Sequence, residues 1–346
     1  MQVDVVGVLE LLRFLEIETM AEEACPPFVA GAPRYSSETF GGRLKNIISQ
    51  LNPLMLLKSS GEVDAAKALL ARHKAGTAGG VGDEALWAAA ELCAARVHPD
   101  TDENIALPLC FAAYAPMQPP IIVGMLWPGG GALNQAFWQV YNQVYNSAVF
   151  FANKNKSSEV SDSDAMLSLA GSVSASLALG VGFNRLGAAI KHPKWGPLVS
   201  GWAGFAGCVG AGWASLLLMR RDELANGVNV VDADGTVHGQ SKAAARVGIA
   251  KCCASRVVWN IPATGITPLA LAKWHATPLC ASLPLAPKLA VDAAICTTGV
   301  VMGVYPGQAL FTQKAEINAA DLEPEFHAKA TKDGAPVATF FYNKGL

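Results

Sequence analysis

The chain has 346 residues, of which 16% are charged, against about 25% in ordinary soluble domains, and its mean hydropathy is +0.29. So little charge excludes an ordinary soluble domain and favours a protein embedded in a lipid bilayer. The formal net charge of −2 excludes nucleic acid as a partner, because no basic stripe is present to neutralise phosphates.

The N-terminal residues do not resemble a segment that is removed after targeting. A secretory signal has a basic start and a continuous apolar core, and a transit peptide is rich in Arg and poor in acidic residues. Here acidic residues are frequent instead, at positions 4, 10, 16, 18, 22 and 23. We therefore expect residues 1–32 to form a loosely ordered leader, with no cleavable presequence and with the targeting signal further along the chain.

Residues 33–103 have the charge density of a soluble section. Apolar residues recur at helical spacing over residues 63–73 and 84–97, and the pairs Gly41–Gly42 and Gly79–Gly80 are typical of turns. A soluble, mostly helical section is therefore predicted ahead of the membrane domain.

Residues 104–153 contain no Asp, Glu, Lys, Arg or His. The first half, residues 105–127, is apolar and long enough to cross a membrane, which takes roughly 20 residues. The second half is rich in uncharged amides: Asn134, Gln135, Gln139, Asn142, Gln143, Asn146 and Asn153. Amides beside a membrane span indicate either a surface that meets a polar solute or a polar helix packed inside protein.

Three later windows are also uncharged and long enough to cross: residues 165–184, 195–219 and 293–313. A fourth window, residues 252–272, reaches spanning length only by including Arg256. With residues 105–127 these windows predict an all-α membrane domain of five transmembrane helices over residues 104–319, followed by a C-terminal tail over residues 320–346. An odd number of spans would place the two termini on opposite sides of the membrane.

Two of these windows carry small residues at every fourth position, a spacing that lets helix backbones approach closely in lipid. The positions are Ala170, Ser174, Ala178 and Gly182, then Ala203, Gly207, Ala211 and Ser215. We expect the two helices to pack as a pair, with chance in an Ala- and Gly-rich chain as the alternative.

Prolines interrupt the first and fourth windows: Pro108, Pro116, Pro119 and Pro120 in one, Pro262 and Pro268 in the other. An interior proline removes a backbone donor, and in lipid the freed carbonyl must face protein or a wet cavity. Broken helices are common where transporters hold substrate near the midplane. Pro116 and Pro262 are therefore candidate gating residues, and a plain structural kink explains them equally well.

Between the third and fourth windows the chain regains soluble character, and residues 230–237 predict a small β-hairpin that turns at Asp234–Gly235. This loop lacks the remaining acidic ligands of a calcium site, and the eight cysteines show no metal-binding spacing. The sequence contains no phosphate-binding loop and no credible Ser/His/Asp arrangement. It therefore predicts neither an enzyme nor a metal or other cofactor.

Short motifs in a fixed order resemble the sideroflexin family. His98, Pro99, Asp100 and Thr101 resemble its HPDT signature, and residues 142–155 are similar to its NQSxNAxVNYxNRN run. The remaining matches are residues 33–35 to PRW, 40–43 to FxGR, 218–224 to LMRQxEL, 232–241 to DxxGNxxGxS, 309–314 to ALFPQK and 342–346 to FNKGL. The ordered resemblance runs from about residue 33 to the end of the chain.

The resemblance implies a five-span protein of the mitochondrial inner membrane that transports small neutral amino acids and feeds one-carbon metabolism. Serine is the first candidate substrate, with alanine and cysteine as others, and an older label for the family is tricarboxylate carrier. Val144 and Phe150 stand where the family has Ser and Asn, and Thr312 replaces a proline. A substrate path along this amide run would therefore be less polar here.

The candidate substrate path consists of amides and one cation. Asn142, Asn146 and Asn153 share one face of a helix, beside Gln143. Such a face can bind the two charges of a zwitterion or hydrogen-bond a neighbouring helix, and both interpretations stay open. Arg256 lies at the membrane edge of the fourth window with Asn260 one turn along. It can pair with a substrate carboxylate or extend to lipid phosphate.

Asp292, at the start of the fifth window, is a candidate partner for Arg256. The alternative is a negative charge that stabilises a helix N-terminus. Asp100 and Thr101 precede an apolar helix, where their oxygens can cap backbone N–H groups. His98 is either a proton-sensing gate or an ordinary polar contact.

The sequence thus predicts an α-helical carrier of small neutral amino acids in the mitochondrial inner membrane. The competing hypothesis is a scaffold or assembly factor whose amide face binds partner helices. Transport of citrate-like anions fits poorly, because several carboxylates need several cations and Arg256 is the only Lys or Arg clearly set into a predicted span.

Overall fold

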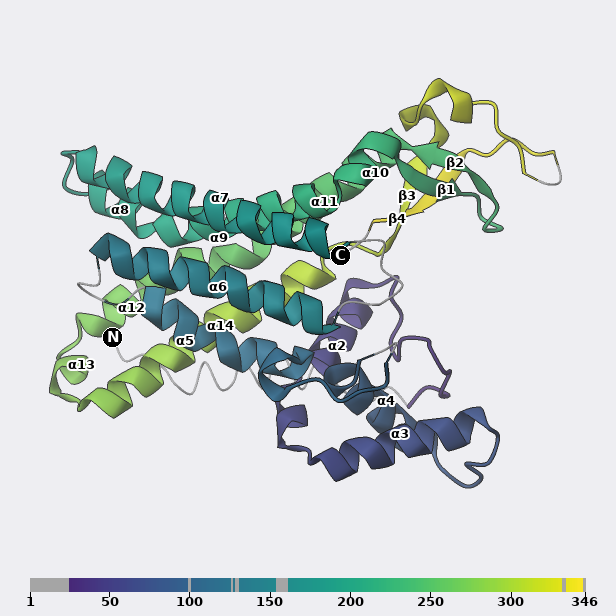
Figure 1. Cartoon of the computed structure of the whole chain (residues 1–346), viewed down its shortest axis with the longest axis horizontal. Helices are drawn as coiled ribbons and strands as arrows, with labels where there is room; N and C mark the ends of the chain where they lie inside the picture. The colour runs from purple at the N-terminus through teal and green to yellow at the C-terminus, as the bar shows by residue number, and fades with distance from the viewer. Residues whose placement is uncertain are drawn as a thin grey trace.

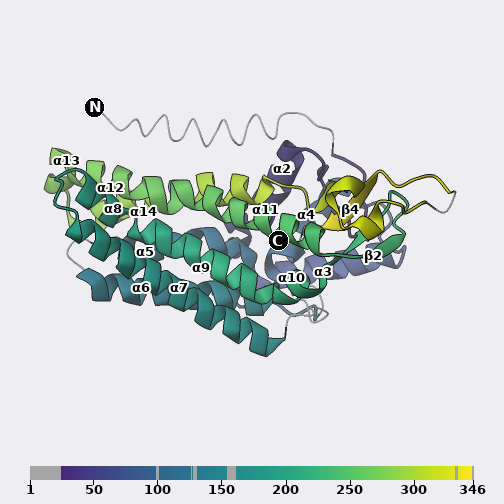
Figure 2. The ribbon, with the colours of Figure 1, turned by 90° about the horizontal axis from the view of Figure 1, so that it is seen from above.

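The computed structural model describes residues 25–98, 101–125, 127, 131–153, 161–331 and 334–344. Most of the predicted leader, residues 1–24, lies outside this range, as do Pro99 and Asp100 of the first motif. Long helices form a bundle, and two smaller sections, a helical one and a β-sheet, lie together at one end of it (Figures 1 and 2).

The helical section contains α2 (Phe40–Gln50), a short 3-10 helix (Pro53–Leu57), α3 (Ser60–Lys74) and α4 (Asp83–Arg96). A capping box starts α3: Glu62 N–H donates to Ser59 Oγ, and Ser59 N–H donates to the Glu62 carboxylate. Buried Val63 on α3 packs against Leu92 on α4. Both helices predicted in this section are confirmed.

Residues 105–127 do not form one continuous helix. Two 3-10 turns (Leu107–Leu109 and Phe111–Ala113) precede α5 (Tyr114–Met125), and α6 (Gly131–Asn153) follows. The Asn134 amide donates to Gly124 O at 2.8 Å, at the end of α5, and the Asn153 amide donates to Leu109 O at 2.8 Å, before its start. The amide-rich helix α6 therefore runs back antiparallel to α5 over its whole length.

The next helices are α7 (Asp162–Ala189), α8 (Trp195–Gly201) and α9 (Ala203–Met219), and α7 packs antiparallel on α9. The expected small-residue stripe on α9 is buried there, apart from half-buried Ser215. The prediction that the α7 stripe packs against the other helix is wrong, because its residues are exposed: Ala170, Ser174, Ala178 and Gly182. The face of α7 that is buried carries Ser168, Ser172, Ser176 and Gly180. Ser168 and Ser176 on this face hydrogen-bond to Ser215 of α9 and Gln139 of α6, partners that lipid cannot supply.

The fold is not all-α, since a four-stranded antiparallel sheet has the order β2-β1-β4-β3. After α10 (Arg221–Asn226), β1 (Val228–Val231) and β2 (Val237–Ser241) form the expected hairpin. The strands β3 (Lys314–Asn318) and β4 (Thr339–Asn343) come from the end of the chain. The tail therefore returns to the hairpin and completes a core around Val230, Phe326 and Phe340.

Asp232 stabilises the hairpin turn. Its carboxylate accepts a hydrogen bond from Thr236 N–H at 2.8 Å and contacts His238 Nε2 at 2.8 Å. The hydrogen bond with His238 is the main cause that holds the pKa of Asp232 below its ordinary value. The Asp in this hairpin is thus a structural residue.

The fourth predicted span is a broken helix. It consists of α11 (Lys242–Asn260), a π-helical turn (Ile261–Ile266) and α12 (Thr267–His275). A short α13 (Pro278–Ser282) leads to α14 (Leu285–Ala309). The break occurs at Pro262, whose carbonyl accepts a hydrogen bond from the Thr267 hydroxyl at 2.8 Å. The interruption predicted from the prolines is confirmed here.

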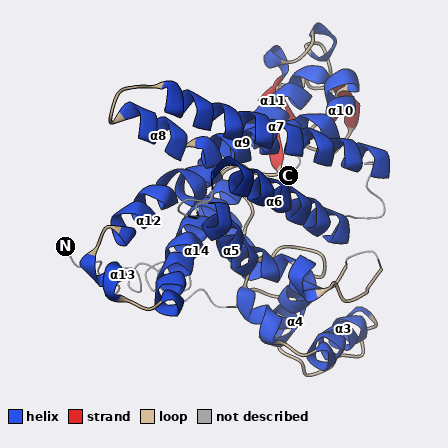
Figure 3. Ribbon diagram, turned by 60° about the vertical axis from the view of Figure 1, so that its left-hand side comes forward, coloured by secondary structure: helices blue, strands red, loops and turns tan. Residues whose placement is uncertain are grey.

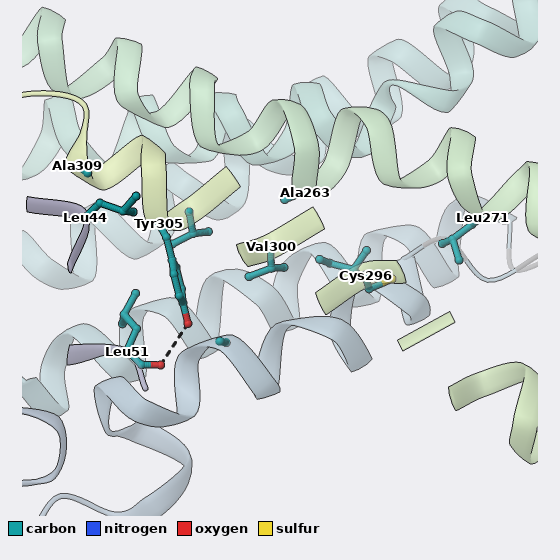
Figure 4. Packing of buried hydrophobic residues seen from close by; sticks show 11 residues of the cluster. Leu44, Leu51, Ala263, Leu271, Cys296, Val300, Tyr305 and Ala309 are labelled. Atoms are coloured by element: carbon teal, nitrogen blue, oxygen red, sulfur yellow. Dashed lines mark hydrogen bonds between the residues drawn. The ribbon is translucent and has the colours of Figure 1, made fainter. Parts of the chain in front are cut away.

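Glycines on α14 bring it against this break. A methyl group at Gly303 would lie 2.0 Å from Trp259 O, and one at Gly299 would lie 3.1 Å from Pro262 O. The cluster behind this contact includes Ala263, Val300 and Tyr305, and Figure 4 shows the Tyr305 hydroxyl donating to Leu51 O at 3.2 Å. Helix α14 is thereby fixed to both the broken helix and the N-terminal section.

In the described part of the chain, three helices are long and apolar enough to cross a membrane: Ser163–Ala189, Trp195–Met219 and Leu285–Ala309. The five predicted spans are therefore not confirmed as such. Six segments follow one another in the bundle: α5, α6, α7, α9, α11–α12 and α14. Hydrogen bonds and close contacts show that each runs antiparallel to the one before it. The Arg43 guanidinium, before α5, donates to Ala309 O, at the end of α14. The residues before and after the bundle thus lie at the same end of it, whereas five crossings would place them at opposite ends.

Candidate functional site

A chain of uncharged polar side chains crosses the bundle from α5 through α6 to α9. The Gln118 amide donates to Asn146 Oδ1 at 3.3 Å, and the Asn146 amide donates to Asn142 Oδ1 at 3.3 Å. The Asn142 amide in turn points to Cys208 Sγ at 3.9 Å. Gln118 and Asn142 are buried, and Asn146 is half-buried. This chain, Gln118–Asn146–Asn142–Cys208, is called the amide network below.

Gln139 extends the polar interior toward α7. The Ser176 hydroxyl donates to Gln139 Oε1 at 2.5 Å, and the Gln139 side chain lies against Gly207 on α9. Gln139 is 1% exposed, yet its Nε2 has no hydrogen-bond partner among the residues that the structure describes. A buried amide N–H without a partner costs free energy. The contacts with Ser176 on α7 and Gly207 on α9 fix the orientation of this α6 side chain.

Arg256 on α11 brings a positive charge close to the amide network. It has no acidic partner among the described residues, and its guanidinium lies over the Trp259 ring, 5.2 Å from the centroid. Its stem crosses α9 at Gly212, where a methyl group would lie 3.0 Å from Cδ. Gly212 is one turn from Cys208 on α9, and Tyr114 on α5 lies within electrostatic range of both Arg256 and Cys208.

Tyr114 also stacks on Tyr145 of α6, with ring centroids 6.5 Å apart. The Tyr145 hydroxyl donates to Pro108 O at 3.1 Å, which holds the irregular start of the first span against α6. Arg256, the stacked rings of Tyr114 and Tyr145 and the amides of α5 and α6 therefore lie in the same part of the bundle. Such a region can bind a small solute that carries a carboxylate and further hydrogen-bonding groups.

The other predicted path residues do not join this arrangement. The Asn153 amide donates to Leu109 O and Val149 O, so it ties the end of α6 to the preceding segment. The Asn260 amide donates to Arg256 O at 2.7 Å, and Thr264 donates to Asn260 O, so Asn260 supports the backbone before the π-helical turn. Gln143 is buried and makes no side-chain hydrogen bond within the described residues.

Asp292 is not the partner of Arg256, because its Oδ1 lies 2.8 Å from His275 Nε2. The predicted ion pair does not form. His275, at the end of α12, lies beside the start of α14, whereas Arg256 lies on α11, before the π-helical turn. Spacing along the sequence could not distinguish the two cations.

The first motif forms a turn at the edge of the helical section. Thr101 N–H donates to His98 Nδ1 at 3.3 Å, and Val97 pairs with Asn104 as an isolated bridge. The Thr101 hydroxyl accepts from Glu103 N–H, several residues before any helix begins, so Thr101 does not cap the first span. Pro99 and Asp100 lie outside the described residues.

The two candidate gating prolines differ in position. Pro116 is exposed in the first turn of α5, away from the amide network, whereas Pro262 lies in the π-helical turn against α14. Sequence reasoning missed Gln118 and Tyr114. A lone amide within the apolar residues 105–127 was the available signal for Gln118, and none was available for Tyr114.

The helices that are long and apolar enough to cross a bilayer, and a polar interior that only a bundle can shelter, define a multi-pass α-helical membrane protein. Residues 30–346 match the family model described as sideroflexins. The chain belongs to the sideroflexin family.

Individual relatives support this assignment over almost the whole chain. Sideroflexin-5 of Rattus norvegicus is 33% identical over 326 residues, which cover 93% of both proteins. A sideroflexin of Dictyostelium discoideum is 32% identical over 94% of this chain and 100% of its own. A sideroflexin of Saccharomyces cerevisiae is 30% identical with the same coverage. No solved structure matches the chain.

Proposed function

We propose that this protein carries small neutral amino acids, serine first, across the mitochondrial inner membrane and so supplies one-carbon metabolism. Family membership supports membrane transport in general. The observation that supports the substrate class is Arg256, a guanidinium without an acidic partner among the described residues. Its stem crosses α9 at Gly212, one turn from Cys208 of the amide network. A charge inside a membrane protein is costly and marks a functional site by default.

In this proposal Arg256 binds the substrate carboxylate through charge-assisted hydrogen bonds. The amide oxygens of Asn142 and Asn146 and the Tyr114 hydroxyl accept hydrogen bonds from the substrate ammonium. With one cation and no fixed anion nearby in the described residues, the site favours a single carboxylate over a citrate-like anion. Uncharged amides hold the ammonium without competing for Arg256.

Alternating exposure of the site would use the π-helical turn. Residues 261–266 join α11, which carries Arg256, to α12, and they contact the glycine face of α14. Irregular backbone of this kind is tolerated at membrane depth where protein or a wet cavity covers it. We propose that α12 and the start of α14 rock against α11 about this turn.

A scaffold or assembly role is the second candidate. The outward-facing stripe of Ala170, Ser174, Ala178 and Gly182 on α7 favours it, since small residues on a lipid-exposed face allow another helix to approach closely. A carrier uses the interior of the bundle, whereas a scaffold uses this outer face, so variants separate the two roles.

The test is uptake of labelled serine by proteoliposomes, with unlabelled alanine, cysteine and citrate as competitors. We expect saturable uptake that the neutral amino acids block and citrate does not. Arg256→Gln should raise KM about tenfold, the loss of one hydrogen bond to a charged group. Arg185→Gln, a change of the same charge at an exposed end of α7, should leave KM unchanged. Absence of uptake by folded, inserted protein would reject the carrier and favour the scaffold.

A further inference from the structure

A cavity of about 380 Å³ lies at the end of the bundle farthest from the sheet and the helical section. Its walls come from the end of α5 and from α12, α13 and the beginning of α14; Figure 3 shows the last three together. Val123, Leu271 and Leu289 supply apolar surface, and Cys280 lies in the wall. Of the residues described, none from the amide network lines this cavity, and neither does Arg256.

Besides the Cys280 thiol, three ionisable side chains line the cavity: Lys288, His275 and Asp292. The Asp292 carboxylate is 9% exposed and lies 2.8 Å from His275 Nε2. Lys288 precedes Asp292 by four residues, so both project from the same face of α14 one turn apart. Lys288 forms no ion pair within the described chain, and it is half-buried.

This arrangement is selective for charge. A phosphate or a dicarboxylate would meet Lys288 but also the carboxylate of Asp292, and a simple amine would meet Lys288 as a repelling charge. A zwitterion places its carboxylate at Lys288 and its ammonium at Asp292, and so satisfies both. The volume is near the lower limit for small-molecule pockets, which run from about 300 Å³ upward, so the ligand is small.

We propose that this α12–α14 pocket is a second binding site for the amino-acid zwitterion. Lys288 binds the carboxylate, Asp292 exchanges its contact with His275 for the ligand ammonium, and the apolar walls receive a short side chain. The site rests on the proposed transport function and extends it. Asp292 lies seven residues after Leu285, the first residue of α14, and so roughly 10 Å from that end of the helix, as expected for an outer vestibule.

The position of the pocket relative to Arg256 gives it a role in transport. Arg256 lies on α11 before the π-helical turn, and His275 lies at the end of α12 after it. The two binding sites are therefore on opposite sides of one break in one helical segment. Rocking at residues 261–266 would move the pocket relative to Arg256 and pass the ligand from one site to the other.

The experiment reads the pocket directly through Cys280, a buried free thiol in its wall. Alkylation of the purified protein is followed by peptide-resolved mass spectrometry, with exposed Cys25 as the internal reference. Serine should slow alkylation of Cys280 and leave Cys25 unchanged. Serinamide, which lacks the carboxylate charge, and glycerate, which lacks the ammonium, should protect Cys280 at least tenfold less effectively.

Two variants assign each contact. Lys288→Gln should weaken protection by serine about tenfold and abolish the difference between serine and serinamide. Asp292→Asn should abolish the difference between serine and glycerate. Lys273→Gln, which removes an exposed lysine from α12 outside the pocket, should behave as wild type. Because Lys288 is half-buried, its variant tests the proposal even where Asp292→Asn does not fold.

The outcomes separate this site from the proposed function. Equal protection by all three compounds, or a Lys288→Gln protein that still distinguishes serine from serinamide, would overturn the pocket. Saturable serine uptake that depends on Arg256 but not on Lys288 would reject the pocket and retain the carrier. Cys280 protection with the expected charge selectivity, in a protein that moves no serine, would retain the pocket and reject the carrier.

Discussion

Gln139 is held by contacts that leave no room for adjustment. Its Oε1 accepts from Ser176, while its Nε2 lies against α9 with no partner in the described part of the chain. The packing depends on Gly207, since a methyl group there would lie 2.9 Å from Gln139 Nε2 and 3.1 Å from Ser176 O. The second of these atoms belongs to the backbone of α7 and cannot rotate away.

We therefore expect Gly207→Ala to destabilise the protein by about 1–3 kcal/mol, the usual cost of overpacking. Gly204→Ala, one turn away on α9, is the matched control, because a methyl group at Gly204 meets nothing within 4 Å. Thermal unfolding in detergent measures both variants. Equal stability of the two would show that α7 and α9 do not approach each other this closely.

Single residues also show how far sequence reasoning reaches. Uncharged amides among apolar residues singled out Asn142, which is buried in the structure, but left open whether it meets a solute or a neighbouring helix. The spacing could not show that Asn153 bonds to the backbone before α5, or that Asp292 contacts His275 rather than Arg256. Those choices depend on where the antiparallel neighbour brings its side chains, which periodicity along one helix does not specify.

Among the elements, the N-terminus of α11 is stabilised from outside its own helix. Glu323, in the C-terminal segment, accepts hydrogen bonds from the Ser241 hydroxyl at 2.7 Å and from the N–H groups of Lys242 and Ala243 at 2.9 Å. Burial opposes ionisation, yet these hydrogen bonds hold the pKa of Glu323 below its ordinary value. The segment therefore caps α11 and joins it to the sheet.

A lowered folded pKa gives a stabilisation that is present above the unfolded pKa, near 4.3 for Glu, and is lost as pH falls through the folded value. We expect hydrogen exchange in residues 314–344 to rise when the pH drops from 7 toward 4, after correction for the intrinsic rate. Glu323→Gln should raise the exchange rate already at pH 7, because loss of the helix cap should lower the local stability by about 1 kcal/mol. Glu325→Gln, at an exposed neighbour, should not. No difference between the two variants at pH 7 would refute the cap.

The strengths and failures of element prediction share one cause. Local patterns located α3, α4, the β1–β2 hairpin and the helix over 195–219, because charge, turn residues and helical spacing act within a few residues. The strands β3 and β4 were missed, since they pair with β1 across a long sequence separation. The start of α14 was also missed, because the predicted window began at residue 293, after Asp292, whereas the helix begins at Leu285 and continues through Lys288 and Asp292.

At the scale of the whole molecule, α6 decides the topology. Its amides excluded it from the predicted spans, but Gln135, Gln139, Asn142 and Asn146 have partners on α5, α7 and α9, so the bundle shelters their polarity. A helix in this position can cross a membrane without an apolar surface all round. Counting α6 as a crossing makes the number of passes even, and both soluble sections then share one side.

We expect the side of each end of the bundle to be measurable with cysteines placed at exposed lysines and glutamates. Lys74→Cys in the helical section and Glu325→Cys in the C-terminal segment should react with a membrane-impermeant maleimide from the same side of sealed proteoliposomes. Lys194→Cys and Lys273→Cys, at the opposite end of the bundle, should react only from the other side.

Peptide-resolved detection separates these positions from the native cysteines, and permeabilised vesicles give full reactivity for each. A five-span chain would place Lys74 and Glu325 on opposite sides of the membrane. Reaction of only one of them before permeabilisation would therefore indicate an odd number of spans and show that α6 is not one of six crossings. Reaction of both together requires an even number of passes, which the six segments α5, α6, α7, α9, α11–α12 and α14 give when all of them cross. That result would agree with an amide network inside the membrane, where the proposed transport needs it, and would exclude five spans.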